Sequence, residues 1–192
     1  MSYLSNRLDE QVVSILQNGG VGFMPSDTIY GLSCLSLNRQ AVERVYRLKK
    51  RDSNKPLILL IATISQLNEL GIDENKTQLA QEYWPGALTQ ICESTSPEWL
   101  HRGTHSLAVR MPDNHELRGL IAKTGPLVST SANIQGDKAA VSVAEAKNYF
   151  SEDLDFYVDA GDLSNHQPST LVRAIDGNLE VIRPGAVKVK EN

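Results

Sequence analysis

Apolar residues recur along the chain with two different periods, and the longer period predicts amphipathic helices. Between Leu8 and Leu16 the apolar positions follow helical spacing, and Asn18-Gly19-Gly20 ends the pattern. Four further helices are predicted where a capping residue precedes an apolar face. These capping residues are Asn38, Thr63 (with a helix through Leu70), Asn114 and Ser142 (with a helix to Phe150).

The shorter pattern consists of brief apolar runs bounded by Pro, Gly and polar residues, which is typical of strands. The predicted strands cover residues 21–24, 57–62, 87–92, 106–111, 126–129, 156–158, 169–175 and 179–182. Asp176-Gly177 joins the last two as an antiparallel hairpin. Helices and strands alternate, so the sequence predicts one α/β domain over residues 1–192, with a twisted mixed sheet and helices on its faces.

Composition narrows the class of protein. Hydrophobic residues make up 41% and charged residues 22% of the 192 residues, which is typical of a folded globular chain rather than a disordered one. The longest apolar run, residues 57–62, is far too short to span a bilayer. We therefore expect no membrane association and a cytoplasmic location.

The charge of the chain is unevenly distributed. Its net charge is −4, yet residues 44–55 contain six Lys or Arg and a single acid, Asp52. Such a cluster can attract an anion, although cations at the end of a helix also arise without any ligand. No glycine-rich phosphate-binding motif is present, so any nucleotide would be bound by side-chain cations.

Small polar residues gather where several predicted strands end. The segments are 25–32, 129–133, 168–170 and 183–185. Ligands of α/β proteins bind in crevices at strand ends, whereas the same residue types are also favoured in ordinary turns. Four such segments together with a basic cluster favour a central concave site.

At these residues the sequence resembles the YrdC/TsaC-type L-threonylcarbamoyladenylate synthases. The resemblance runs from about Gly19 to Gly185. It rests on eight motifs in the family's order, which are Pro25–Leu32, Lys49-Lys50-Arg51, Lys55-Pro56-Leu57, Trp84–Thr89, Ala108–Pro112, Ser131-Ala132-Asn133, Pro168-Ser169-Thr170 and Arg183-Pro184-Gly185.

The resemblance implies a reaction and a set of site residues. The family condenses L-threonine, bicarbonate and ATP to threonylcarbamoyl-AMP and pyrophosphate, with Mg²⁺ held mainly by the ATP phosphates and no metal site on the protein. Downstream transferase proteins then modify tRNA. The resemblance assigns catalysis to Lys49 and Arg51, ATP binding to Arg51, Lys55, Ser106, Ser131, Asn133 and Arg183, and L-threonine binding to Thr28, Arg110, Ser129 and Ser169.

The chain departs from the family pattern at several points. Ser26 replaces a threonine, Leu60 a histidine, and Ala139 a serine that would contact nucleotide. The chain ends soon after Gly185, so we expect the C-terminal domain of the longer family branch to be absent, and the sequence assigns no active-site lid.

Two alternatives to the synthase remain open at this point. One is a non-catalytic RNA-binding or ribosome-associated module on the same fold, and weak tRNA binding is compatible with the basic cluster. The other is a paralogous enzyme with a different carbamoyl or acyl-adenylate substrate. The acidic remainder of the chain disfavours the RNA-binding module, since broad phosphate contact needs a wide positive face.

Overall fold

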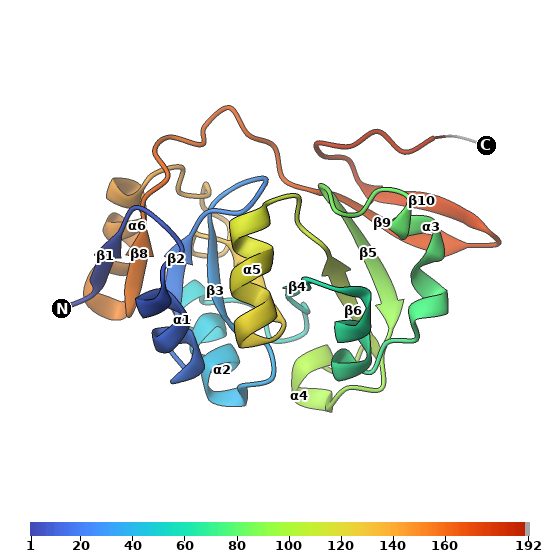
Figure 1. Ribbon diagram of the computed structural model, residues 1–192, viewed down its shortest axis with the longest axis horizontal. Coiled ribbons are helices and arrows are strands. Elements are labelled where there is room, and N and C mark those ends of the chain that lie inside the picture. Colours follow the sequence, from blue (N-terminus) through green and yellow to red (C-terminus); the bar gives the residue numbers. More distant parts are fainter. Residues whose placement is uncertain (191–192) are drawn as a thin grey trace.

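Ten strands form one continuous mixed sheet in the computed structural model, which describes residues 1–190. The sheet order is β1-β8-β2-β3-β7-β4-β6-β5-β9-β10 (Figure 1). The strands are β1 Tyr3–Ser5, β2 Gly22–Met24, β3 Gly31–Leu35, β4 Ile58–Leu60, β5 Leu88–Glu93, β6 Ser106–Arg110, β7 Leu127–Ser131, β8 Phe156–Val158, β9 Thr170–Ile175 and β10 Asn178–Arg183.

Parallel and antiparallel pairs are interspersed in this sheet. Strand β8 is parallel to both β1 and β2, β4 to β6, and β5 to β9, whereas β2–β3, β3–β7, β4–β7, β5–β6 and β9–β10 are antiparallel. The predicted α/β class, the mixed sheet and the C-terminal hairpin are thus confirmed.

Local side-chain chemistry explains where the helices begin. The helices are α1 Glu10–Gln17, α2 Arg39–Lys49, α3 Gln78–Gln81, α4 Glu98–His101, α5 His115–Thr124 and α6 Val143–Phe150, with short 3₁₀ helices η1 Ile64–Leu70, η2 Glu74–Thr77 and η3 Ser151–Asp153. The predicted caps Asn38, Asn114 and Ser142 each accept a hydrogen bond from a backbone N–H of the first turn. Thr63 makes no such bond, because its hydroxyl contacts the Ser65 hydroxyl instead, and the segment after it is 3₁₀ rather than α.

The alternation of side chains along the strands divides the core between two faces of the sheet. On β7, Leu127 packs with residues of α1 and α5 such as Leu16 and Ile121. Its neighbour Val128 belongs to the other cluster, with Val42 of α2 and residues of α6. None of the described helices is long and apolar enough to cross a membrane.

Strands β1 and β3 are missing from the prediction. The β3 sequence Gly-Leu-Ser-Cys-Leu offers little apolar alternation, and residues 25–32 were expected to be a polar strand end. Pairing with β2 and β7 buries β3 almost completely, including Ser33. Gly31 permits this pairing, since a Cβ there would lie 3.0 Å from both the Ser129 hydroxyl and the Thr130 carbonyl.

Candidate active site

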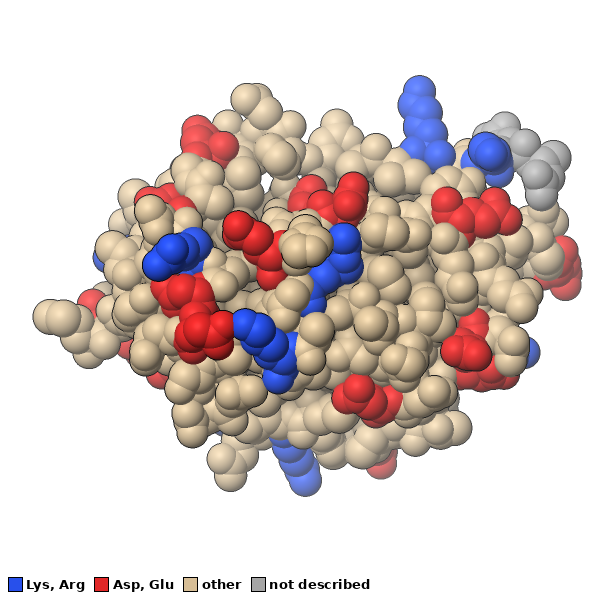
Figure 2. Space-filling model, viewed as in Figure 1, with Lys and Arg blue, Asp and Glu red and all other residues tan. Residues whose placement is uncertain are grey.

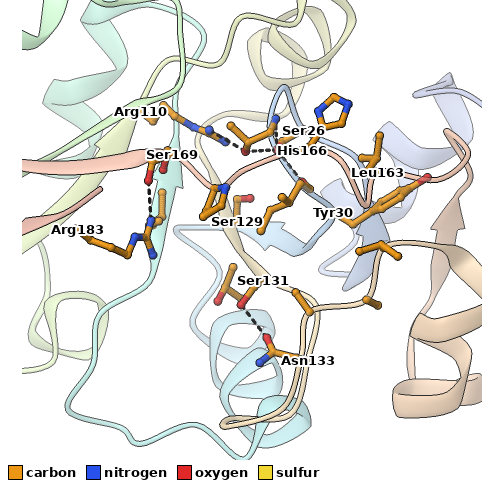
Figure 3. Close-up of a pocket in the computed structure, with 18 of the residues that line it drawn as sticks. Ser26, Tyr30, Arg110, Ser129, Ser131, Asn133, Leu163, His166, Ser169 and Arg183 are labelled. Atoms are coloured by element: carbon orange, nitrogen blue, oxygen red, sulfur yellow. Dashed lines mark hydrogen bonds between the residues drawn. The ribbon is translucent and has the colours of Figure 1, made fainter. Parts of the chain in front are cut away.

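A cavity of about 460 Å³ opens where segments distant in the sequence converge on the middle of the sheet (Figure 3). It is lined by the loop after β2, the end of β7, the segment 133–141 and the segment 163–169. The segment between β8 and β9 runs along the top of the molecule in Figure 1. The concave site expected at the strand ends is therefore present.

Side-chain alternation on β7 brings two of the predicted hydroxyls to the cavity. Ser129 and Ser131 share a face of the strand with Leu127. Leu127 is covered by α1 and α5, whereas Ser129 and Ser131 line the cavity. One face of a single strand thus changes from apolar core to polar site over five residues.

Three arginines line the cavity, and Arg51 enters it from the loop after α2. Its Nε donates to the Lys55 carbonyl at 3.1 Å and its Nη2 donates to the Pro56 carbonyl at 3.1 Å. A guanidinium has five N–H donors. Two are engaged in these bonds, so the other N–H groups can face an anion while the backbone fixes the plane of the group.

Arg110 is the most deeply buried of the three, with 3% of its surface exposed. Its Nη1 donates to the Thr28 hydroxyl at 2.9 Å, and its Nη2 lies 3.2 Å from Oδ1 of Asp27. Its Nε is buried without a hydrogen-bond partner among the described residues. Burial lowers the pKa of Arg110, while the Asp27 carboxylate opposes that shift. The guanidinium is thus held by an ion pair, and its Nε has no hydrogen-bond partner among the described residues.

Arg183 reaches the cavity from the end of β10 and fixes the backbone of Ser169, a residue predicted to bind L-threonine. Its Nη2 donates to the Ser169 carbonyl at 2.8 Å (Figure 3). The Ser169 hydroxyl is buried and lies 2.7 Å from the Thr89 hydroxyl. Burial lowers the pKa of Arg183 as well.

Lys49 has a different environment from the one expected. It is 1% exposed and is not among the residues that line the cavity. Its ammonium donates to the carbonyl of Ser131, and at 3.0 Å to both the carbonyl and Oδ1 of Asn133. Burial, and then the charge of Arg51, lowers the pKa of Lys49 to about 7. All three ammonium donors are used within the protein, so Lys49 organises the Ser131–Asn133 segment instead of facing a ligand.

Asn133 extends this organisation into the loop beyond β7. Its Oδ1 accepts from the Ser131 hydroxyl at 2.7 Å, and its Nδ2 donates to the carbonyls of Ile134 and Asp137 at 2.9 Å each. Figure 3 shows the side chains of Ser131 and Asn133 pointing toward each other and joined by this hydrogen bond. The spacing of these two residues therefore builds a rigid wall of the cavity.

Lys55 and Ser106 were expected at the site, and the structure places both outside the cavity lining. The Lys55 ammonium is 3.8 Å from Asp52 and its side chain is 58% exposed. Ser106 begins β6 and Arg110 ends it, which separates them by about 13 Å along an extended strand. Of the six cations in residues 44–55, Arg51 is the one that lines the cavity, while Arg44 forms an ion pair with Asp155.

Several cavity residues were not predicted. Tyr30 lines the cavity, and its hydroxyl donates to the Gly161 carbonyl at 2.8 Å and accepts from the Ala160 N–H at 2.7 Å. These bonds anchor the segment that brings Leu163 and His166 to the cavity (Figure 3). Because this segment has no periodic pattern of apolar residues, no sequence signal could identify it.

The cavity has cationic walls but little acidic character. Asp137 is the one acid among the described residues that line it. No group of three or more His, Cys, Asp or Glu that could hold a metal ion exists in residues 1–190. On the face shown in Figure 2, Lys and Arg are isolated and interspersed with Asp and Glu. The arrangement suits a small anionic ligand in the cavity better than a long polyanion on that face.

Comparisons with known proteins identify a matching family model and similar curated proteins. The Sua5/YciO/YrdC family model, described as telomere recombination, matches residues 14–185. Threonylcarbamoyl-AMP synthase of Pseudoalteromonas translucida is 35% identical over 175 residues, which cover 87% of this chain and 93% of that protein.

Two solved structures share the fold over nearly the whole chain. The crystal structure of Pyrococcus abyssi Sua5 complexed with L-threonine has a TM-score of 0.83 and 28% identity, and covers 96% of this chain and 57% of that chain. Escherichia coli YciO has a TM-score of 0.84 and 25% identity, and covers 99% of this chain and 98% of that chain.

Proposed function

This chain belongs to the Sua5/YciO/YrdC family, and on that premise we propose that it is a threonylcarbamoyl-AMP synthase. The observation that carries the proposal is the convergence of Arg51, Arg110 and Arg183 on one cavity walled by small hydroxyls. ATP, L-threonine and bicarbonate are the proposed substrates. Related synthases that this chain covers to 93% and 94% of their own length support this activity over the two alternatives raised by the sequence.

The proposed reaction brings anions together and therefore needs fixed positive charge. The threonine amine and bicarbonate form a carbamate with loss of water. A carbamate oxygen then attacks the α-phosphorus of ATP, and the bond to pyrophosphate breaks. Arg51 and Arg183 would stabilise the charge that develops on the phosphates, since a guanidinium can donate two parallel hydrogen bonds to a phosphate. No nucleophilic side chain is required, because positioning and electrostatics supply the catalysis.

Arg110 is the proposed partner of the threonine carboxylate. Arg110 lines the cavity, and an arginine can bind a carboxylate through charge-assisted hydrogen bonds. Thr28 bonds the same guanidinium and, with Ser129 and Ser169, would complete the threonine subsite. The Asp27 carboxylate keeps Arg110 oriented while the site is empty of substrate.

Lys49 and Asn133 would contribute to nucleotide binding indirectly, by holding the Ser131–Asn133 segment in place. The ammonium of Lys49 fixes the positions of Ser131 and Asn133. The Ser131 hydroxyl would then contact the AMP part of ATP. We retain Lys49 as a positioning residue and leave Lys55 and Ser106 out of the proposed contacts.

Mg²⁺ fits this cavity as a companion of ATP. The donor set lacks a carboxylate cluster, and Mg²⁺ commonly binds through phosphates, waters and one or two carboxylates. Asp137 is the carboxylate that could join such a shell. The bound ion would neutralise charge on the phosphates. Transfer of the product to tRNA-modifying proteins, weak tRNA binding and a cytoplasmic location stay predictions.

Pyrophosphate release tests the proposal directly. The protein is mixed with ATP, Mg²⁺, bicarbonate and one amino acid at a time. Pyrophosphate should form with threonine and require bicarbonate. Arg51→Ala should lower that rate at least ~10-fold through loss of a charge-assisted contact. Absence of a threonine-dependent signal in the unmodified protein would reject the synthase assignment.

A further inference from the structure

Arg51 reaches the cavity from a loop whose position is set by residues behind it. Helix α2 ends at Lys49, and Lys50 adopts the left-handed conformation with a φ of 47°. This left-handed residue ends the helix immediately before Arg51. The loop is then tied at Asp52, whose N–H donates to Oε1 of Gln135 at 2.9 Å.

Tyr46 supplies the second tie and contacts the same carbonyl group as Arg51. Its hydroxyl donates to the Lys55 carbonyl at 2.9 Å, and the Arg51 Nε donates to that carbonyl at 3.1 Å. The Arg51 N–H also donates to the Tyr46 carbonyl at 3.0 Å. Tyr46 is 5% exposed and does not line the cavity. It can influence a ligand there only through the loop.

Arg102, which is outside the cavity lining, stacks on the ring of Tyr46. Its guanidinium carbon lies 3.9 Å from the ring centroid, and its Nη1 is 2.9 Å from Oε1 of Glu43. Its Nε and Nη2 are buried without hydrogen-bond partners among the described residues. Leaving donors unpaired is unfavourable, and stacking of a cation on an aromatic face offsets part of that cost.

We propose that Tyr46, backed by Arg102, is a positioning residue that fixes Arg51 for the nucleotide phosphates. The inference rests on the proposed ATP-dependent activity of the same cavity. Tyr46 fixes the shared carbonyl, and the carbonyl fixes the Arg51 plane through its Nε. Without the Tyr46 hydroxyl, the Lys55 carbonyl accepts one of these two hydrogen bonds instead of both. Arg51 then samples orientations that do not bind phosphate.

The test compares Tyr46→Phe with a matched control. Tyr157→Phe also removes a buried hydroxyl that donates to a backbone carbonyl, that of Ser151, and lies outside the cavity lining. Titration calorimetry with ATP and Mg²⁺ measures nucleotide affinity, and pyrophosphate release measures KM for each substrate. Tyr46→Phe should weaken ATP binding ~2–10-fold and leave the threonine KM unchanged, as expected for one hydrogen bond. Tyr157→Phe should change neither.

A double-mutant cycle separates positioning from general loss of structure. In an Arg51→Ala background, Tyr46→Phe should have no further effect on ATP affinity, because the group it positions is gone. Effects that multiply would overturn the inference, and so would wild-type ATP affinity in Tyr46→Phe. Calorimetry does not need turnover, so lack of threonine-dependent pyrophosphate with normal ATP binding would count against the proposed function alone.

Discussion

The ion pair of Arg110 with Asp27 offers the sharpest test of how the site is built. Their side chains are 4% and 6% exposed, so both charges are largely removed from water. Arg110→Met keeps an unbranched side chain and removes the guanidinium. It leaves the Asp27 carboxylate buried, with the Asp113 N–H as its remaining donor at 2.9 Å. Breaking a buried pair from one side typically costs about 3–5 kcal/mol.

The companion variant removes both charges. Arg110→Met with Asp27→Asn retains an amide oxygen for the Asp113 N–H and leaves no uncompensated charge. Its free energy of unfolding should return to within about 1 kcal/mol of the wild-type value, because replacing a buried pair is often neutral. Threonine-dependent pyrophosphate release should stay low in both variants, since each lacks Arg110, the residue proposed to bind the threonine carboxylate.

Urea denaturation at pH 7 measures these free energies. A single variant as stable as wild type would show that the pair carries no net interaction. A double variant no more stable than the single one would show that the loss came from packing around Arg110 rather than from the isolated Asp27 charge. Either result would refute this account of the site.

Three further outcomes follow from other features of the cavity. The lowered pKa of Lys49, about 7 against 10.5 for the free side chain, means that the folded chain binds fewer protons than the unfolded chain between these values. Stability should therefore rise with pH across that window, and urea denaturation of Lys49→Met should show a shallower rise, whereas equal slopes would contradict the assignment. Leu163→Ala should loosen the cavity-lining segment around residues 163–169 and speed its cleavage by protease at least ~3-fold, since Leu163 packs against the core. An unchanged cleavage rate would show that the Tyr30 hydrogen bonds alone hold this segment in place. Threonine should exceed serine in kcat/KM by only ~5–150-fold, because one methyl group distinguishes them, and a ratio above ~10³ would point to a polar contact that we have not assigned.

Sequence patterns predicted those parts of the fold that depend on local chemistry. Caps such as Asn38 and Ser142 need only neighbouring backbone N–H groups, so they could be identified from a few residues. Strand β3 depends on partners up to about a hundred positions away, and its short, partly polar sequence carries no periodic signal. Its burial is decided by pairing with β7 rather than by its own composition.

The charged residues of the site likewise could not be assigned separate roles from the sequence. Six cations within residues 44–55 look equivalent in the sequence, yet the structure gives them separate tasks. Lys49 is bound to carbonyls 82 and 84 positions away, Arg44 to Asp155, and Arg51 alone of the six lines the cavity. The directions of Arg44 and Lys49 follow from α2 periodicity, but their partners are fixed only by the assembled fold, and Arg51 lies in the loop beyond the helix.

Each arginine of the cavity is oriented before any ligand arrives, and this bears on how the site could work. Backbone carbonyls hold Arg51 and Arg183, and Asp27 with Thr28 holds Arg110. A preoriented guanidinium stabilises developing charge without reorganising during the reaction. Lysine could not replace it, since a single ammonium has no planar pair of donors left after bonding to the backbone. An Arg51→Lys variant should therefore show most of the ~10-fold or larger loss of pyrophosphate release expected for Arg51→Ala. Wild-type pyrophosphate release by Arg51→Lys would show that positive charge alone is sufficient.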